Sequence, residues 1–256
     1  MQLFDTHAHL NDERLYNRLD EVLANARAAS LVGIATVGYD WQSSLFAVRL
    51  AEKHPGYLYA VTGVHPHDAS TWSSQLADKL YQLALEPQVV AVGEIGLDYY
   101  RDLSPRDVQK KVFCEQIELA KTLKKPIVIH DRDAHGDILK ILKEQRAGEN
   151  GGILHCFSGS REMALDCLRL GFHLSFAGPL TYTNARNLTE ACAAVPLSEM
   201  LVETDCPYLS PHPLRGKINE PANCALVAEK IAQIKGISAE EVGRITTANA
   251  RAVYRI

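Results

Sequence analysis

Two histidines near the start of the chain have the spacing of metal ligands. The segment Asp5-Thr6-His7-Ala8-His9 places two histidines two positions apart. On an extended strand, alternate side chains project from the same face, so His7 and His9 can bind one ion together. Two core or surface histidines would show the same spacing, but their position at the end of the first apolar run favours metal binding.

Three further polar residues lie in or at the end of short apolar runs. Glu94 lies in VVAVGEIGLDYY, His130 ends PIVIH, and His155 ends GGILH. A buried carboxylate needs a cation or several donors, so Glu94 is either paired with an arginine or bound to a divalent metal. One strand-end histidine is usually an ordinary core residue, but several in equivalent places favour a shared site.

The segment MLVETDCPYL adds two acids on one face of a run near the end of the chain. We assign Asp205, which is nearer the predicted rim, to metal binding and to positioning water. Glu203 lies deeper and is a candidate partner that supports a metal ligand or a lysine from behind.

The combined ligands are imidazoles and carboxylates, a set that suits Zn, Mn, Co, Fe or, less well, Mg. One ion seldom takes six protein ligands and still leaves room for a substrate, so we expect two divalent ions that share Glu94. Such a pair lowers the pKa of a bound water and stabilises the attacking and leaving oxygens of an ester, which predicts hydrolysis. The expected ligands are His7, His9, Glu94 and Asp205 for one ion, and Glu94, His130 and His155 for the other.

Short apolar runs that alternate with segments of helical spacing must position these residues. Ser104 with Pro105, and Ser160, predict helix starts, and the helix after Ser160 is expected to stop at Gly171. The alternation fits a parallel sheet covered by helices. The predicted strands span residues 3–9, 33–38, 58–64, 89–95, 126–130, 151–156, 172–177 and 200–205.

The polar strand ends distinguish a closed barrel from an open doubly wound sheet. In a barrel the carboxyl ends of the strands converge on one mouth, whereas in an open sheet they would be spread along an edge. We therefore expect an α/β fold, a TIM (β/α)8 barrel, as a single domain over residues 1–256, because no linker or repeat divides the chain. The helical segment from about residue 220 is expected to close the barrel or pack beneath it.

Composition sets limits on the partners and the compartment. The net charge of -4 argues against an extensive basic surface for binding duplex DNA, although it allows a local basic rim around a cleft. The start MQLFDTHAHL lacks the apolar run of a signal peptide, and no stretch approaches the roughly 20 apolar residues of a membrane span, so we expect a cytoplasmic protein. The six cysteines contain no C-x-x-C pair, which favours free thiols over a zinc knuckle.

Seven motifs taken together resemble those of the TatD family of metal-dependent hydrolases, within the amidohydrolase superfamily. They run in consistent order from Leu3 to about Asn223. The resemblance implies a TIM barrel, a centre of one or two metals, and hydrolysis of phosphodiester bonds, commonly as a deoxyribonuclease with 3'-to-5' exonuclease action. The motifs are FDTHAHL, GVHPH, GEIGLDYYRD, VIHDRDAHGD, HCFSGS, ETDCPYL and RGKINEPAN.

Residue by residue, the family pattern implies the same six metal ligands and adds His65 of GVHPH. His65 is then expected to contact the substrate phosphate or an oxygen at the metal site, and with Glu94 and Asp205 it completes the expected catalytic set. One departure concerns Ile218, which replaces a basic residue of the family's R-G-K-R-N-E-P pattern. The lost positive charge predicts a change in affinity or substrate choice if that loop grips a nucleic-acid backbone.

The expected partner is single-stranded DNA or a frayed end. Arg132, Arg215 and Lys217 are candidates for phosphate contacts, and Tyr99 or Tyr100 for base stacking, although all of them fit ordinary surface positions too. Two other functions compete. A hydrolase of a small amide, lactone or phosphate ester would use the same metal chemistry. A metal-stabilised scaffold protein would have closed coordination with no open position for water.

Overall fold

Eight parallel strands form a nearly closed barrel in the computed structural model, which describes residues 1–256. The strands pair in sequence order from β1 to β8, and each occupies one of the predicted apolar runs. This confirms the predicted single-domain TIM-barrel fold. The strands are β1 Leu3–Ala8, β2 Leu31–Val37, β3 Leu58–Thr62, β4 Val89–Asp98, β5 Ile127–Arg132, β6 Gly152–Leu154, β7 His173–Phe176 and β8 Met200–Val202.

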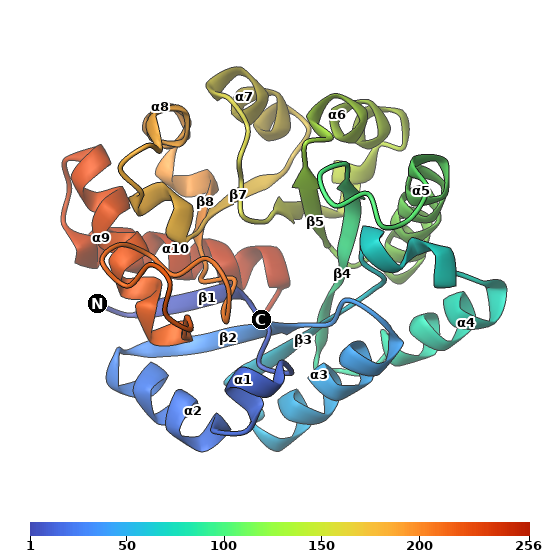
Figure 1. Cartoon of the computed structure of the whole chain (residues 1–256), viewed down its shortest axis with the longest axis horizontal. Helices are drawn as coiled ribbons and strands as arrows, with labels where there is room; N and C mark the ends of the chain where they lie inside the picture. Colours follow the sequence, from blue (N-terminus) through green and yellow to red (C-terminus); the bar gives the residue numbers. More distant parts are fainter.

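Helices surround the ring of strands, as Figure 1 shows. None of them combines the length and the apolar composition needed to cross a membrane. The helices are α1 Glu13–Tyr16, α2 Leu19–Ala28, α3 Trp41–Lys53, α4 Ser74–Leu83, α5 Arg106–Leu123, α6 His135–Glu144, α7 Arg161–Arg169, α8 Arg186–Ala194, α9 Cys224–Lys235 and α10 Ala239–Tyr254. Short 3-10 helices are η1 Pro66–Thr71, η2 Ala147–Asn150, η3 Gly178–Thr181, η4 Leu197–Glu199 and η5 Pro221–Asn223.

Two apolar clusters hold the layers together. The larger one has 52 buried residues and packs the outer faces of the strands against the helices. The smaller one has 12 and fills the inside of the barrel with strand side chains such as Phe4 and Val128. Because strand side chains alternate between the two faces, every strand can contribute to both clusters while its end remains free to carry polar residues.

Helix α10 closes the end of the barrel opposite the polar strand ends, as predicted for the helical segment from about residue 220. Val253 and Tyr254 belong to the interior cluster, and the Tyr254 hydroxyl donates to the Thr6 carbonyl oxygen at 2.8 Å. Arg255 donates to the carbonyl oxygen of Asn150 at 3.0 Å. Figure 1 places the carboxyl terminus at the middle of the ring of strands. The site can therefore open only at the other end.

No regular ladder of backbone hydrogen bonds joins β1 to β8. The side chain of Asp5 supplies some of the hydrogen bonds at this seam. One isolated bridge joins Ala8 of β1 to Cys206 in the segment that follows β8. The buried Asp5 carboxyl accepts from the Thr204 N–H at 3.0 Å and the His7 N–H at 3.2 Å, and it hydrogen-bonds the Thr204 hydroxyl. Burial raises the pKa of Asp5 to about 8, so the group is mostly protonated at neutral pH.

We expect Asp5→Ala to lower the free energy of unfolding by about 3 kcal/mol, because it leaves two buried N–H groups without an acceptor. Asp5→Asn has the shape and donor capacity of the neutral acid and should cost less than about 1 kcal/mol. Urea denaturation of both variants measures the difference. Equal losses in the two variants would show that the carboxyl is ionised in the folded protein.

Two local predictions had different outcomes. Ser160 does cap α7, since its hydroxyl accepts from the Met163 N–H at 3.3 Å. The prediction for Ser104 was wrong: α5 has Pro105 at its N-cap, and the buried Ser104 hydroxyl instead donates to the His67 carbonyl oxygen at 2.8 Å. The Ser104 hydroxyl therefore bonds to η1, not to the N-terminus of α5 as the local pattern predicted.

Candidate metal centre

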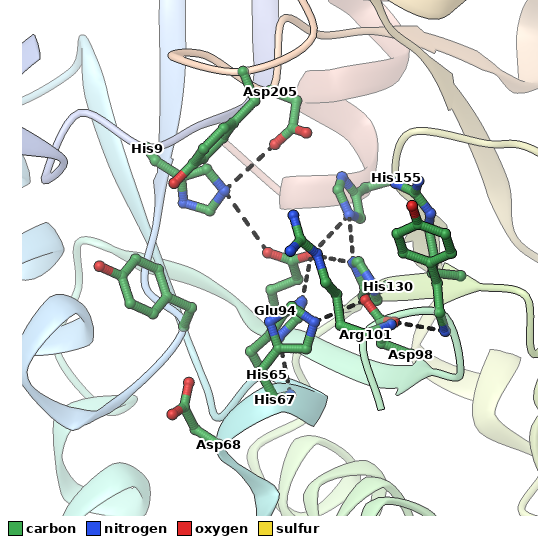
Figure 2. A pocket seen from close by; sticks show the side chains of 14 residues that line it. His9, His65, His67, Asp68, Glu94, Asp98, Arg101, His130, His155 and Asp205 are labelled. Carbon is green, nitrogen blue, oxygen red and sulfur yellow. Dashed lines mark hydrogen bonds and ion pairs between the residues drawn. The ribbon is translucent and has the colours of Figure 1, made fainter. Parts of the chain in front are cut away.

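The six expected metal ligands come together at the carboxyl ends of the strands. His7 is fully buried at the end of β1, and the other five line a cavity of 390 Å³ that opens at the mouth of the barrel. Figure 2 shows Glu94 in the middle, with His9 and Asp205 on one side and His130 and His155 on the other. The cavity is also lined by Tyr39, His65, His67, Asp68, Asp98, Tyr100, Arg101, Arg132 and Tyr208.

Three ligand atoms, from His7, His9 and Glu94, have the mutual distances of a metal coordination shell. His7 Nε2 lies 3.3 Å from His9 Nε2 and 3.4 Å from Glu94 Oε2, and His9 Nε2 lies 3.8 Å from Glu94 Oε2. Metal–ligand bonds of about 2.1 Å in a tetrahedron put the ligands roughly 3.4 Å apart, so these three atoms can hold one divalent ion together. Asp205 Oδ1 lies 3.7 Å from His7 Nε2 and 3.4 Å from His9 Nε2, which places it beside the same group.

The other carboxylate oxygen of Glu94 faces a second group of imidazoles. Glu94 Oε1 lies 2.7 Å from His130 Nδ1, 2.8 Å from His155 Nε2 and 3.5 Å from His65 Nε2. The nitrogens of His130 and His155 are 3.4 Å apart. Glu94 thus presents one oxygen to each group, which is the arrangement that a bridging carboxylate requires.

Hydrogen bonds on the far side of three rings set their tautomers. His9 Nδ1 donates to the Val37 carbonyl oxygen at 3.1 Å, and His155 Nδ1 faces Glu203 Oε1 at 3.3 Å. His130 Nε2 faces Asp98 Oδ2 at 3.1 Å. When one ring nitrogen of a neutral imidazole carries its proton toward an outer acceptor, the other offers its lone pair inward. The inner nitrogens of these rings are therefore oriented as metal ligands.

His65 has the opposite orientation. Its Nδ1 accepts from the His67 backbone N–H at 3.1 Å, so the proton of the neutral ring lies on Nε2, which faces the cavity. Burial, with a smaller effect of His130, lowers the pKa of His65 to about 4, which keeps the ring neutral. A neutral ring with an inward N–H is a hydrogen-bond donor rather than a metal ligand.

The buried charges compensate one another in the absence of metal. Burial alone would raise the pKa of Glu94, but the neighbouring imidazoles, above all His155, hold it well below its usual range. Burial likewise opposes protonation of His155, yet Glu94 and Glu203 raise the pKa of its imidazole well above the usual value. Metal ions would replace these imidazole protons, so metal binding is expected to release protons and to weaken in acid.

Glu203 lies behind the site rather than in it. The side chain is fully buried, and its Oε1 also accepts from the Cys156 N–H at 2.7 Å. Strand β8 ends at Val202, and Asp205 has a left-handed φ of 55°, so the two acids do not simply share the face of a regular strand. This turn brings Asp205 to the rim while Glu203 stays beneath His155.

A close approach between β4 and β5 positions Glu94 beside His130. Gly96 has φ 145°, and a Cβ there would lie 2.0 Å from the His130 carbonyl oxygen. A larger residue would therefore push the strands apart. The glycine two positions after Glu94 allows the carboxylate and the imidazole to meet.

Two residues of the cavity, His67 and Asp98, have roles that the sequence patterns did not indicate. Strand β4 continues past the predicted end at residue 95, which puts Asp98 on the same face as Glu94. Asp98 Oδ2 lies 2.8 Å from His67 Nε2, opposite its contact with His130. His67 in GVHPH and Asp98 in GLDYY are polar residues that the sequence displays, but only the folded structure shows that they contact each other.

The predicted substrate contacts divide into two sets. Arg132 ends β5 and lines the cavity. Arg215 and Lys217 are exposed on the loop after β8 and do not line it, and the Arg215 guanidinium lies 4.4 Å from the centre of the Tyr182 ring. These two residues therefore lie farther from the metal ligands than Arg132 does.

Comparisons with known proteins point to one family. The sequence model of the family described as TatD related DNase matches residues 4–255. The chain is 46% identical over 254 residues to an uncharacterized metal-dependent hydrolase, YabD, of Bacillus subtilis (strain 168), covering 99% of each chain. It is 37% identical to the 3'-5' ssDNA/RNA exonuclease TatD of Klebsiella pneumoniae (strain 342), covering 99% of this chain and 98% of that one.

A solved structure shows the same architecture. The crystal structure of YJJV, a TatD homologue from Escherichia coli K12, superposes with a TM-score of 0.93 at 28% identity. The match covers 99% of this chain and 98% of the other. The similarity therefore extends over the whole barrel and is not confined to the motifs.

Proposed function

This chain belongs to the TatD-related DNase family of metal-dependent hydrolases, and on that premise we propose that it releases nucleotides from single-stranded DNA by hydrolysing phosphodiester bonds. The observation that carries the proposal is the position of Glu94, with one oxygen toward each of two groups of imidazoles at the base of an open cavity. A relative named as a 3'-5' ssDNA/RNA exonuclease supports the choice of single-stranded DNA as substrate. We propose that nucleotides are removed in the same 3'-to-5' direction.

In this proposal two divalent ions would share Glu94. His7, His9, Asp205 and Glu94 would hold the first, and Glu94, His130 and His155 would hold the second. Such ions would supply a nucleophilic water at neutral pH and offset the charge of the phosphate. Glu203 and Asp98 orient the rings of His155 and His130, so that the ligand nitrogens stay aimed at the ions.

The remaining residues act on the water and the substrate. Asp205 lies at the rim with its carboxylate partly exposed, where it orients the attacking water and accepts its proton. His65 donates its Nε2–H to a phosphate oxygen, and Arg132 binds phosphate from the β5 side of the cavity. Arg215 and Lys217 lie farther out and bind phosphates of the strand that follows.

Labelled single-stranded oligonucleotides test the function. Purified protein with Mg, Mn or Zn is expected to release nucleotides, and Asp205→Asn should slow the release at least about a hundred-fold because it removes the proton acceptor. The exposed Asp78→Asn in α4 is the matched control and should leave the rate unchanged. Hydrolysis of a small ester without any release of nucleotides would overturn the proposal in favour of a small-molecule hydrolase.

A further inference from the structure

The turn after β4 is fixed to the metal centre through Asp98. Asp98 Oδ1 accepts from the backbone N–H of Arg101 at 2.7 Å and of Tyr100 at 3.0 Å. The same carboxylate contacts His67 and His130 through Oδ2. One buried side chain thus sets the position of this turn relative to a predicted metal ligand.

Arg101 is a free cation at the mouth of the cavity. Its side chain makes no ion pair, whereas Arg106 and Lys110 on the adjacent helix pair with Asp102 and Asp137. Figure 2 shows the Arg101 side chain reaching across the mouth of the cavity. Since metal ions would add positive charge beside it, an anion is a favourable partner for this guanidinium, and a phosphate fits its forked geometry.

Tyr100 offers an aromatic surface next to this guanidinium. Tyr100 is 61% exposed and lines the cavity, and the Arg132 guanidinium lies 4.6 Å from the centre of its ring. Tyr99 differs, because its hydroxyl donates to Asp137 at 2.6 Å and its ring does not line the cavity. Of the two tyrosines predicted as stacking candidates, only Tyr100 is therefore available to a ligand in the cavity.

The charges around the mouth favour one side for a nucleic-acid strand. The β4–β5 side carries Arg101 and Arg132 without ion pairs. The β2–β3 side carries Asp68 in the cavity and Asp40 close by, and burial followed by repulsion from Asp40 raises the pKa of Asp68. A phosphate chain is attracted to the first side and repelled from the second.

We propose that the turn Tyr99–Asp102 is a nucleotide clamp, in which Arg101 binds a phosphate beside the metal centre and Tyr100 stacks on a base of the same strand. The inference rests on the proposed function, since it assumes that a single strand enters this cavity. Asp98 is the positioning residue of the clamp. The clamp discriminates nucleic acid from small phosphodiesters, which have no base to stack and no second phosphate.

Binding of a phosphorothioate-linked oligothymidylate, which resists cleavage, tests the clamp in the metal-loaded full-length protein. Fluorescence anisotropy should show affinity lowered about five- to one-hundred-fold for Tyr100→Ala, with Tyr100→Phe near wild type. An oligomer of the same length without bases should bind Tyr100→Ala and wild type equally. For Arg101→Gln, the slope of log affinity against log salt should fall in magnitude by about 0.7, which corresponds to one lost contact to single-stranded DNA.

Arg244→Gln is the matched control, because it removes the same charge from an exposed position in α10 that neither lines the cavity nor contacts the turn. Equal behaviour of the Tyr100, Arg101 and Arg244 variants would overturn the clamp while leaving the nuclease proposal intact. Wild-type protein that hydrolyses methyl p-nitrophenyl phosphate but neither binds nor cleaves any oligonucleotide would overturn both. Loss of oligonucleotide binding with unchanged hydrolysis of the small ester in Tyr100→Ala supports the clamp.

Discussion

Replacing Glu94 with glutamine is expected to lower kcat/KM by about a thousand-fold or more. The carboxylate faces both imidazole groups, so its loss would remove a shared anion from the two proposed ion sites and several kcal/mol of transition-state stabilisation. Metal analysis is expected to find two ions per chain in the wild type and at most one in the purified variant. Kinetics and elemental analysis on the same preparation measure both effects.

Glu86→Gln is the control for this change. Glu86 is exposed just before the other end of the same strand, so the substitution removes an equal charge without touching the cavity. It should retain wild-type activity and metal content. If Glu94→Gln kept full metal content and activity, the carboxylate would have no bridging role and the two-ion arrangement would be wrong.

Removing the metal is expected to abolish activity and to lower the melting temperature by about 10 °C. Ions that bind only the folded chain stabilise it by about 4 kcal/mol when free metal is a thousand times the dissociation constant, and 1 kcal/mol corresponds to roughly 2–4 °C in a chain of this size. Without ions, the buried carboxylates depend on imidazole protons alone. Thermal melts and activity assays before and after dialysis against a chelator measure the change, and added Mn or Zn should restore both.

Glu94→Gln provides the internal control for this experiment. Its melting temperature should respond less to the chelator than that of the wild type, because fewer ions are bound at the start. A wild-type protein that keeps its activity after complete removal of metal, verified by elemental analysis, would contradict a metal-dependent reaction.

The barrel and most of the centre could be predicted because local patterns encode them. A parallel strand buried on both faces reads as an apolar run, so a polar residue such as His130 or His155 at its end is conspicuous. The convergence of strand ends in a closed barrel then brings together residues that are far apart in the sequence. Alternation along β1 likewise predicted that His7 and His9 face one point.

The surroundings of the ligands were harder to predict because they depend on contacts between loops. The pairing of His67 with Asp98 joins η1 to the end of β4, and only the folded barrel defines the relative position of these two elements. The local sequence predicts Ser104 as a helix cap, because the carbonyl oxygen of His67 that binds its hydroxyl instead belongs to another element. The loop carrying Arg215 folds toward Tyr182, which a charge count along the chain does not reveal.

The seam between the first and last strands has a consequence for the newly made chain. The first proposed ion needs His7 and His9 from β1 and Asp205 from just after β8, so almost the whole protein must leave the ribosome before these ligands can meet. A partly synthesised chain therefore carries no complete hydrolytic centre near the messenger RNA that encodes it. An ion held by these residues would link the first and last strands of the sheet directly.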